Sequence, residues 1–380
     1  MTIQGDRRTI QNDRQTVIIY KPNALNQYDA IDNPTRRVVR GEAVGDPTVT
    51  VNNQPTTRQG NGFAAFIEGN NHAGPGWTPV TTRAIKVGAG ANGANLVSTS
   101  KGNLYFPPAH EVPGYDYDGN LLSDGRWTYT WDGENRLTAM QTNPRAIAAG
   151  IPLARAEYSY DGDSRRISRS QRNWDAGSQA FIADPAPTRF LWKDWTLLAE
   201  LKATGGQLAL SRSYAWGLDP QDTLTATGNV GNLLAIIDSE GTQPVALLPA
   251  YDGNGNIIIL ADSAGQAAIS YDYDAFGNQV LAINHAARTN PIGPVAKAAA
   301  RNAWGFSTKQ VDPLTTFSYY GYRYYDAVTG RLPSRDPIEE QGGNNVYGFV
   351  GNNGASQIDL HGQIPLDTIW TSSMLYTILL

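Results

Sequence analysis

A short unit built from tyrosine, aspartate and glycine or asparagine recurs along this chain and limits its fold more than any other feature. In each copy one or two tyrosines precede Asp, and an apolar residue follows the turn residues. The clear copies are Tyr115–Asn120, Tyr158–Asp163, Tyr251–Asn256, Tyr271–Asn278 and Tyr322–Gly330. Leu25–Asn33 is a degenerate copy, and Trp127–Leu137 carries Trp in the Tyr position. Internal repeats of this kind indicate one supersecondary unit used many times.

The chemistry of the unit predicts a β-hairpin. Tyr-x-Tyr places two rings on one face of a strand, because side chains alternate with a period of two. Asp followed by Gly or Asn favours a tight turn, with positive φ where Gly stands. A single hairpin cannot bury its aromatic face, so we expect neighbouring hairpins to stack and pack the tyrosines in a core. We expect the aspartates to cap turns. The fold class predicted is all-β.

Composition agrees with this class and excludes several functions. Charged residues make up 17% of the chain and the net charge is −5, so no nucleic-acid partner is expected. The absence of cysteine excludes disulfides and thiolate chemistry, and the four histidines lack metal-binding spacing, so neither a metal nor a cofactor is expected. The best helix candidate is Pro294–Asn302, which is rich in alanine.

The N-terminus is polar, so we expect no signal peptide in this chain. No apolar run reaches 18 residues, and a membrane span is not expected.

One segment carries a specific family resemblance. Residues 306–353 contain F-S-T-K, Y-Y-G-Y-R-Y-Y-D, T-G-R, S-R-D-P-I and Q-G-G-N-N-V-Y-G-F in this order. They resemble the core domain associated with RHS repeats, and the recurring units resemble the RHS or YD repeats themselves. These repeats occur in bacterial Rhs proteins, in the C component of insecticidal toxins and in teneurins. The resemblance implies a spiral of YD-repeat hairpins, a partial β-cocoon, that ends in a core plug.

On this basis the chain divides into five predicted parts. Residues 1–34 hold degenerate repeat strands, and residues 35–110, rich in Gly, Asn, Thr and Pro, form an inserted β module or loops. Residues 111–290 are the YD repeats, residues 291–363 the core, and residues 364–380 a short tail, too short to be a toxin domain.

The resemblance also implies self-cleavage of an aspartic type. Family members cut the chain just after the core, and the matching positions here are Arg335, Asp336 and Asp359, with the scissile bond at Gln363–Ile364. The usual D-P-x-G-L signature is D-L-H-G-Q in this chain. Two carboxyl groups held close together would share one negative charge, so one can act as an acid and the other as a base. The alternative is that these residues only fix the plug by ion pairs or turns.

Three functions remain open at this point. The first is a structural shell in a toxin or cell-surface system, secreted or surface-bound as part of a larger protein. Its partners would be an encapsulated toxin or a neighbouring shell protein. The second is a non-cleaving surface adhesion protein that binds carbohydrate through aromatic faces. The third is an inert fragment of a larger gene. An enzyme with a diffusible substrate is not expected.

Overall fold

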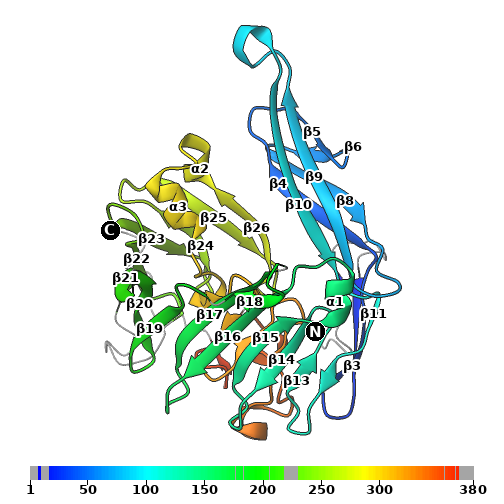
Figure 1. Cartoon of the computed structure of the whole chain (residues 1–380), viewed down its shortest axis with the longest axis vertical. Helices are drawn as coiled ribbons and strands as arrows, with labels where there is room; N and C mark the ends of the chain where they lie inside the picture. The colour runs from blue at the N-terminus through cyan, green and yellow to red at the C-terminus, as the bar shows by residue number, and fades with distance from the viewer. Residues whose placement is uncertain are drawn as a thin grey trace. The chain divides into compact units, whose positions relative to one another are not determined.

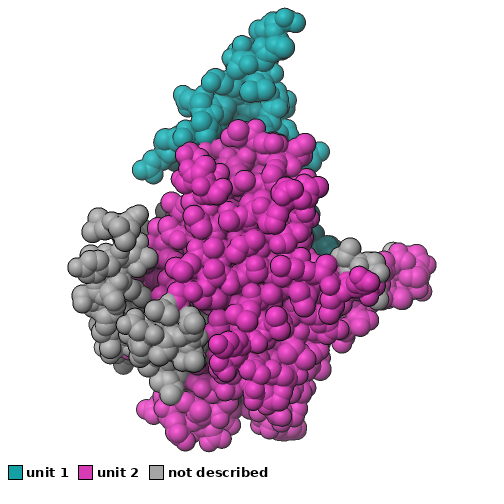
Figure 2. Space-filling model, turned by 90° about the vertical axis from the view of Figure 1, so that its left-hand side faces the viewer, with its two compact units in different colours: residues 1–116, 121–128, 141–153 teal, residues 117–120, 129–140, 154–380 magenta. Residues whose placement is uncertain are grey.

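The computed structural model describes residues 7–9, 17–175, 177–182, 184–204, 206–217, 230–354, 356–363 and 365–367. The described chain is almost entirely β structure and forms antiparallel strand pairs (Figure 1). It divides into two compact units, residues 1–116, 121–128 and 141–153, and residues 117–120, 129–140 and 154–380 (Figure 2). The all-β prediction is confirmed.

The first unit contains short sheets with small cores. One sheet has the order β1-β2-β3-β11, a second β10-β9-β5-β6 and a third β4-β8-β7. The strands are β1 (Arg7–Thr9), β2 (Val17–Pro22), β3 (Tyr28–Asp32), β4 (Arg36–Glu42), β5 (Thr48–Val51), β6 (Gln54–Pro55), β7 (Thr57–Gln59), β8 (Gly62–Glu68), β9 (Gly76–Lys86), β10 (Leu96–Phe106) and β11 (His110–Glu111). Residues 35–110 therefore contain seven strands, β4 to β10, and the short 3₁₀ turn η2 (Ala91–Gly93).

The largest sheet has 15 strands, and nearly all of them pair with their neighbours in sequence. They are β12 (Gly114–Tyr115), β13 (Leu121–Ser123), β14 (Trp127–Trp131), β15 (Leu137–Thr142), β16 (Ala154–Tyr160), β17 (Arg166–Asp175), β18 (Ala180–Ile182), β19 (Thr188–Lys193), β20 (Thr196–Thr204), β21 (Gln207–Trp216), β22 (Leu233–Asp238), β23 (Val245–Tyr251), β24 (Ile257–Ala261), β25 (Ala267–Tyr273) and β26 (Gln279–Asn284). β18 pairs with β17 beside the main path. A run of consecutive hairpins is what the repeats predict.

Several of the predicted turns are capped by their own aspartates. The Asp161 side chain accepts hydrogen bonds from the backbone N–H groups of Asp163 and Arg165, at 3.0 and 2.9 Å. The Asp252 side chain does the same for Asn254 and Asn256. The turn-capping prediction is therefore confirmed in these copies, and the capping explains why Asp stands at this place.

A second repeated contact joins each hairpin to the one before it. In each case a Tyr hydroxyl or a Trp indole N–H, near the end of one strand, donates a hydrogen bond to a backbone carbonyl of the preceding hairpin. The accepting residue is the one that follows the turn of that hairpin. The pairs are Tyr160 to Leu137 (2.6 Å), Trp192 to Arg166 (2.8 Å), Trp216 to Leu197 (2.8 Å), Tyr251 to Leu233 (2.5 Å) and Tyr273 to Ile257 (3.1 Å). We call the five accepting residues the rung residues. All five are buried.

Residues 285–363 follow the sheet and lie against it. They contain α2 (His285–Thr289), α3 (Pro294–Ala300), β27 (Gln310–Val311), β28 (Ser318–Tyr319), β29 (Tyr324–Tyr325) and β30 (Gln357–Asp359), with the 3₁₀ turns η3 (Phe306–Thr308), η4 (Glu339–Gly342) and η5 (Val350–Asn352). β31 (Pro365–Asp367) comes next, and α1 (Pro144–Ala148) lies earlier, after β15. α3 confirms the predicted helix, whereas α1 and α2 were not predicted.

In Figure 1 the strands from β16 to β26 curve around the C-terminal segment, coloured orange to red. This segment has an aromatic core of its own, in which the Tyr325 and Phe349 rings stack with centroids 3.9 Å apart. Tyr158 and Tyr271, from two of the repeat units, are buried, as the ring-packing prediction requires.

Candidate functional site

The residues that precede the predicted cut form a hairpin loop. β30 pairs antiparallel with β31, and Asp359 stands opposite Pro365. The loop between them carries Leu360, His361, Gly362 and Gln363. Ile364, the residue predicted after the cut, lies outside the described residues.

Asp359 organises this loop from within. One oxygen of its buried carboxyl group, Oδ1, accepts hydrogen bonds from the N–H groups of His361, Gly362 and Gln363, at 3.1, 2.7 and 3.2 Å. Gly362 has φ +76°, and a Cβ there would lie 3.2 Å from the Cβ of Arg323. Glycine is required because the conformation is left-handed and the space is taken. The D-x-x-G spacing therefore encodes one tight loop.

The carbonyl groups of the loop are held from outside. The Lys309 ammonium donates to the Leu360 carbonyl at 2.7 Å, and the Tyr322 N–H donates to the His361 carbonyl at 3.1 Å. Arg323 Nε donates to the Gly362 carbonyl. Three successive carbonyls are thus fixed, and the next carbonyl along the chain belongs to the predicted scissile bond.

Asp336 lies near that carbonyl. A methyl group on the Cα of Gly342, in the turn η4, would lie 2.5 Å from Asp336 Oδ2 and 2.7 Å from the Gln363 carbonyl oxygen. One oxygen of the carboxylate and the scissile carbonyl oxygen therefore border one small region that only a glycine leaves open. Asp336 itself is fixed by Arg323, whose Nη2 lies 2.6 Å from Oδ2, and by the Ile338 N–H, which donates to Oδ1 at 3.1 Å.

Burial makes the two carboxyl groups hard to ionise together. Burial raises the pKa of Asp359, against the opposing charges of Arg323 and Lys309 and two of the backbone hydrogen bonds. Burial also raises the pKa of Asp336, and the negative charge of Asp359 adds to this, while Arg323 acts in the opposite direction. A pair with raised pKa values can hold one proton between them, which is the state that acid–base hydrolysis needs.

A polar cavity of about 490 Å³ reaches the same place. Its lining includes Asp336, Gln363, Arg335, Arg136 and Glu134. Polar walls and this volume suit several water molecules.

The structure thus brings Asp336, Asp359 and Gln363 together. The Arg335 side chain is exposed and lines the polar cavity, whereas the guanidinium paired with Asp336 belongs to Arg323. Sequence reasoning missed Arg323 because it stands in Y-R-Y-Y-D, a motif interpreted as a repeat unit. A signal was available, since a cation within an aromatic strand needs an anionic partner.

No group of three or more His, Asp or Glu side chains in the described parts of the chain is arranged to hold a metal ion. None of the described helices combines the length and apolar character that a bilayer span requires.

Comparison with known proteins finds similarity to segments of bacterial toxins. It is 27% identical over 256 residues to the tRNA nuclease WapA of Bacillus subtilis, covering 66% of this chain and 9% of WapA. It is 28% identical over 247 residues to double-stranded DNA deaminase toxin A of Burkholderia cenocepacia, covering 63% of this chain and 16% of the toxin. Toxin subunit YenC2 of Yersinia entomophaga is 38% identical over 84 residues, which cover 20% of this chain. The chain thus spans only a small part of each relative, and no family model matches it.

Solved structures support the same fold. The crystal structure of TcdB2-TccC3 superposes with a TM-score of 0.50 and 18% identity, covering 91% of this chain and 16% of that chain. The fold is thus shared with a segment of TcdB2-TccC3.

Proposed function

We propose that this chain is a shell segment of a bacterial toxin system, secreted or displayed at the cell surface, whose C-terminal core cuts the chain once between Gln363 and Ile364. The shell part is supported by the fold and by similarity to toxins over most of the chain. The cut is supported above all by one observation. The Asp336 carboxylate and the Gln363 carbonyl oxygen both border the space left open at Gly342, and both residues line a polar cavity.

The proposed reaction is hydrolysis by one water molecule. Asp336, kept ionised by Arg323, takes a proton from water while the water oxygen bonds to the carbonyl carbon of Gln363. Asp359, protonated in its buried position, gives its proton to the leaving nitrogen of Ile364 as the carbon–nitrogen bond breaks. The chain then ends in a carboxyl group at Gln363, and no further turnover follows.

Partners follow from the shell role. An encapsulated toxin or a neighbouring shell protein is the proposed partner, because the relatives are long toxins of which this chain matches one segment. The carbohydrate alternative gains little support from five tyrosines of the repeat units. The Tyr158 and Tyr271 rings are buried, and the hydroxyls of Tyr160, Tyr251 and Tyr273 bond inward to carbonyls. The inert-fragment alternative predicts a chain that fails to fold alone.

The test is the intact mass of the purified chain beside Asp336→Asn and Asp359→Asn variants. We expect the parent to end at Gln363 and both variants to keep residues 364–380. Measurement in neutral denaturant releases any bound tail and protects Asp312–Pro313 and Asp336–Pro337, which are acid-labile bonds. Asp163→Asn, at an exposed turn position, is the control and should be cut like the parent. A full-length parent would overturn the cleavage proposal.

A further inference from the structure

One rung residue breaks the pattern of the other four. Leu137, Leu197, Leu233 and Ile257 are apolar, but the equivalent position after the Tyr158–Asp163 unit is Arg166, which is 2% exposed. Its guanidinium carbon lies 4.5 Å from the centre of the Phe190 ring and 4.4 Å from that of Tyr319. A buried cation where repeats elsewhere place leucine or isoleucine needs a specific reason.

The partners of Arg166 form a single row on the C-terminal core. Its Nη2 donates to Gln310 Oε1 at 2.8 Å, its Nη1 to the Tyr324 hydroxyl at 3.2 Å, and its backbone N–H to the Tyr319 hydroxyl at 2.8 Å. Gln310 stands directly opposite Tyr319, and Tyr319 directly opposite Tyr324, across β27, β28 and β29. Directly opposite residues share one face of a sheet. One side chain of the repeat sheet therefore contacts all three strands.

Residues on the opposite face of these strands contact the loop that precedes the predicted cut. Lys309, Tyr320 and Arg323 each adjoin one of the three row residues in sequence, so alternation turns them to the other face. Lys309 and Arg323 donate to the carbonyls of the loop, and the Cβ of Tyr320 would lie 3.3 Å from a Cβ on Gly362. The strands β27 to β29 thus lie between Arg166 and the predicted scissile bond.

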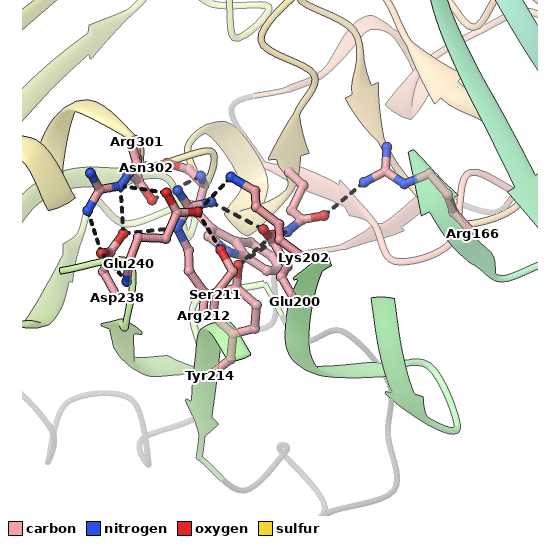
Figure 3. A network of polar contacts seen from close by, with 12 residues as sticks. Arg166, Glu200, Lys202, Ser211, Arg212, Tyr214, Asp238, Glu240, Arg301 and Asn302 are labelled. Atoms are coloured by element: carbon pink, nitrogen blue, oxygen red, sulfur yellow. Dashed lines mark hydrogen bonds and ion pairs between the residues drawn. The ribbon is translucent and has the colours of Figure 1, made fainter. Parts of the chain in front are cut away.

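Arg166 also belongs to a larger polar network. Gln310 Nε2 donates to Glu200 Oε1 at 2.7 Å, and Glu200 pairs with Arg212 at 3.2 Å (Figure 3). In Figure 3 the guanidinium of Arg166 points toward this network from the right of the view. Gln310 is therefore fixed from two strands of the repeat sheet, which defines one docked position for the core.

We infer that Arg166 is a positioning residue for the proposed cut: docked on Gln310, Tyr319 and Tyr324, it fixes the strands whose opposite face holds the loop 360–362. This inference rests on the proposed function. It makes the cut depend on a completed repeat sheet, because the cation is supplied by the repeats and not by the core. Arg166 touches neither the reacting carbonyl nor either aspartate in the contacts described above.

The test compares Arg166→Leu, which restores the apolar rung, with Leu233→Ala, which opens an equivalent rung two hairpins further along. Full chains are made by cell-free synthesis and quenched in denaturant at intervals, and the release of residues 364–380 is followed by intact mass. We expect Arg166→Leu to slow release by about tenfold to 100-fold, and Leu233→Ala to release at the parent rate. Tyr324→Phe, which removes only one hydroxyl, should slow release less and covers the case in which Arg166→Leu does not fold. Equal rates for the Arg166 and Tyr324 variants and the parent would overturn the inference.

A second measurement separates this inference from the cleavage proposal. In an Asp336→Asn background, which keeps the chain intact, hydrogen exchange is measured for the amides of residues 361–363. We expect faster exchange with Arg166→Leu than with Leu233→Ala, because the strands that hold the loop are no longer fixed. If the parent is never cut but this difference is found, the cleavage proposal fails and the positioning role stands. If exchange is equal in both variants, the positioning role is overturned.

Discussion

At the scale of single residues, Arg323 joins the parts of the candidate site. Its guanidinium contacts the Asp336 carboxylate, the Val346 carbonyl at 2.9 Å and the Gly362 carbonyl. Burial lowers the pKa of Arg323, and the charges of Asp336 and Asp359 oppose this. The side chains of Arg323 and Asp336 are 2% and 4% exposed, so neither charge can turn to water if the other is removed.

Arg323 and Arg335 should therefore respond very differently to the same substitution. Arg323→Leu leaves a buried carboxylate without its ion pair, and we expect a loss of about 3–5 kcal/mol in the free energy of unfolding. Arg335→Leu, at an exposed position, should change it by less than about 0.5 kcal/mol. Urea denaturation of both variants, each made in a chain that keeps Asp336, measures the two changes in the free energy of unfolding. A larger loss for Arg335→Leu would contradict the assignment.

His361 gives the site a pH dependence with a defined sign. Burial, and then the charge of Lys309, lower the pKa of His361 to about 4 from its usual 6.5. Between these pH values the unfolded chain binds more protons at this position than the folded chain, so the free energy of unfolding rises with pH across the window. We expect His361→Gln to flatten this part of the curve, measured by urea denaturation at several pH values. His72→Gln, at an exposed position, is the control, and an unchanged slope for His361→Gln would disprove the prediction.

At the scale of elements, the contact from aromatic residue to rung residue fixes the register of successive hairpins. Trp192 and Trp216 take the place that tyrosine has in the recognised units, because an indole N–H can donate to a carbonyl as a phenol hydroxyl does. The repeat therefore continues through residues 188–217, where no YD unit is written in the sequence.

The hydroxyl of one such tyrosine can be tested alone. The Tyr251 hydroxyl bonds the Leu233 carbonyl, and Leu233 is completely buried. Tyr251→Phe should lower the free energy of unfolding by about 1–2 kcal/mol, because a buried acceptor loses its donor. Tyr117→Phe, in another repeat unit but fully exposed, should leave it unchanged. Equal denaturation midpoints for the two variants would argue against the register role.

At the scale of the whole second unit, the core docks on the repeat sheet through ion pairs as well as through apolar and aromatic contacts such as that of Trp304 with Tyr214. Arg301 pairs with Asp238 at 2.5 Å, and Arg169 with Asp312 at 2.6 Å. Burial acts to raise the pKa of Asp312, but Arg169, the Thr315 N–H and the charge of Arg166 together hold this pKa below its usual value. Buried ion pairs add little net stability over apolar contacts, but a misplaced charge is strongly penalised. Such an interface selects one docked position, which a site built from distant segments requires.

The sequence by itself determined the features that depend on neighbouring residues. Period-two aromatics and Asp-Gly turns specify hairpins, because alternation and turn capping act within a few positions. Repetition of these hairpins then requires an all-β sheet. The D-L-H-G-Q motif likewise encodes its own loop, since Asp359 binds N–H groups two to four residues further on. The resemblance carried Asp336 and Gln363 to the same site.

Only the tertiary structure decided which cation pairs with each carboxylate and which rung residue is charged. Arg323 and Arg335 are equally plausible partners of Asp336 in the sequence, and the choice follows from the direction in which each strand and turn points its side chain. The row that Arg166 contacts begins 144 positions further along, at Gln310. Contacts of this range leave no local pattern, because they depend on how the hairpins stack and where the core docks.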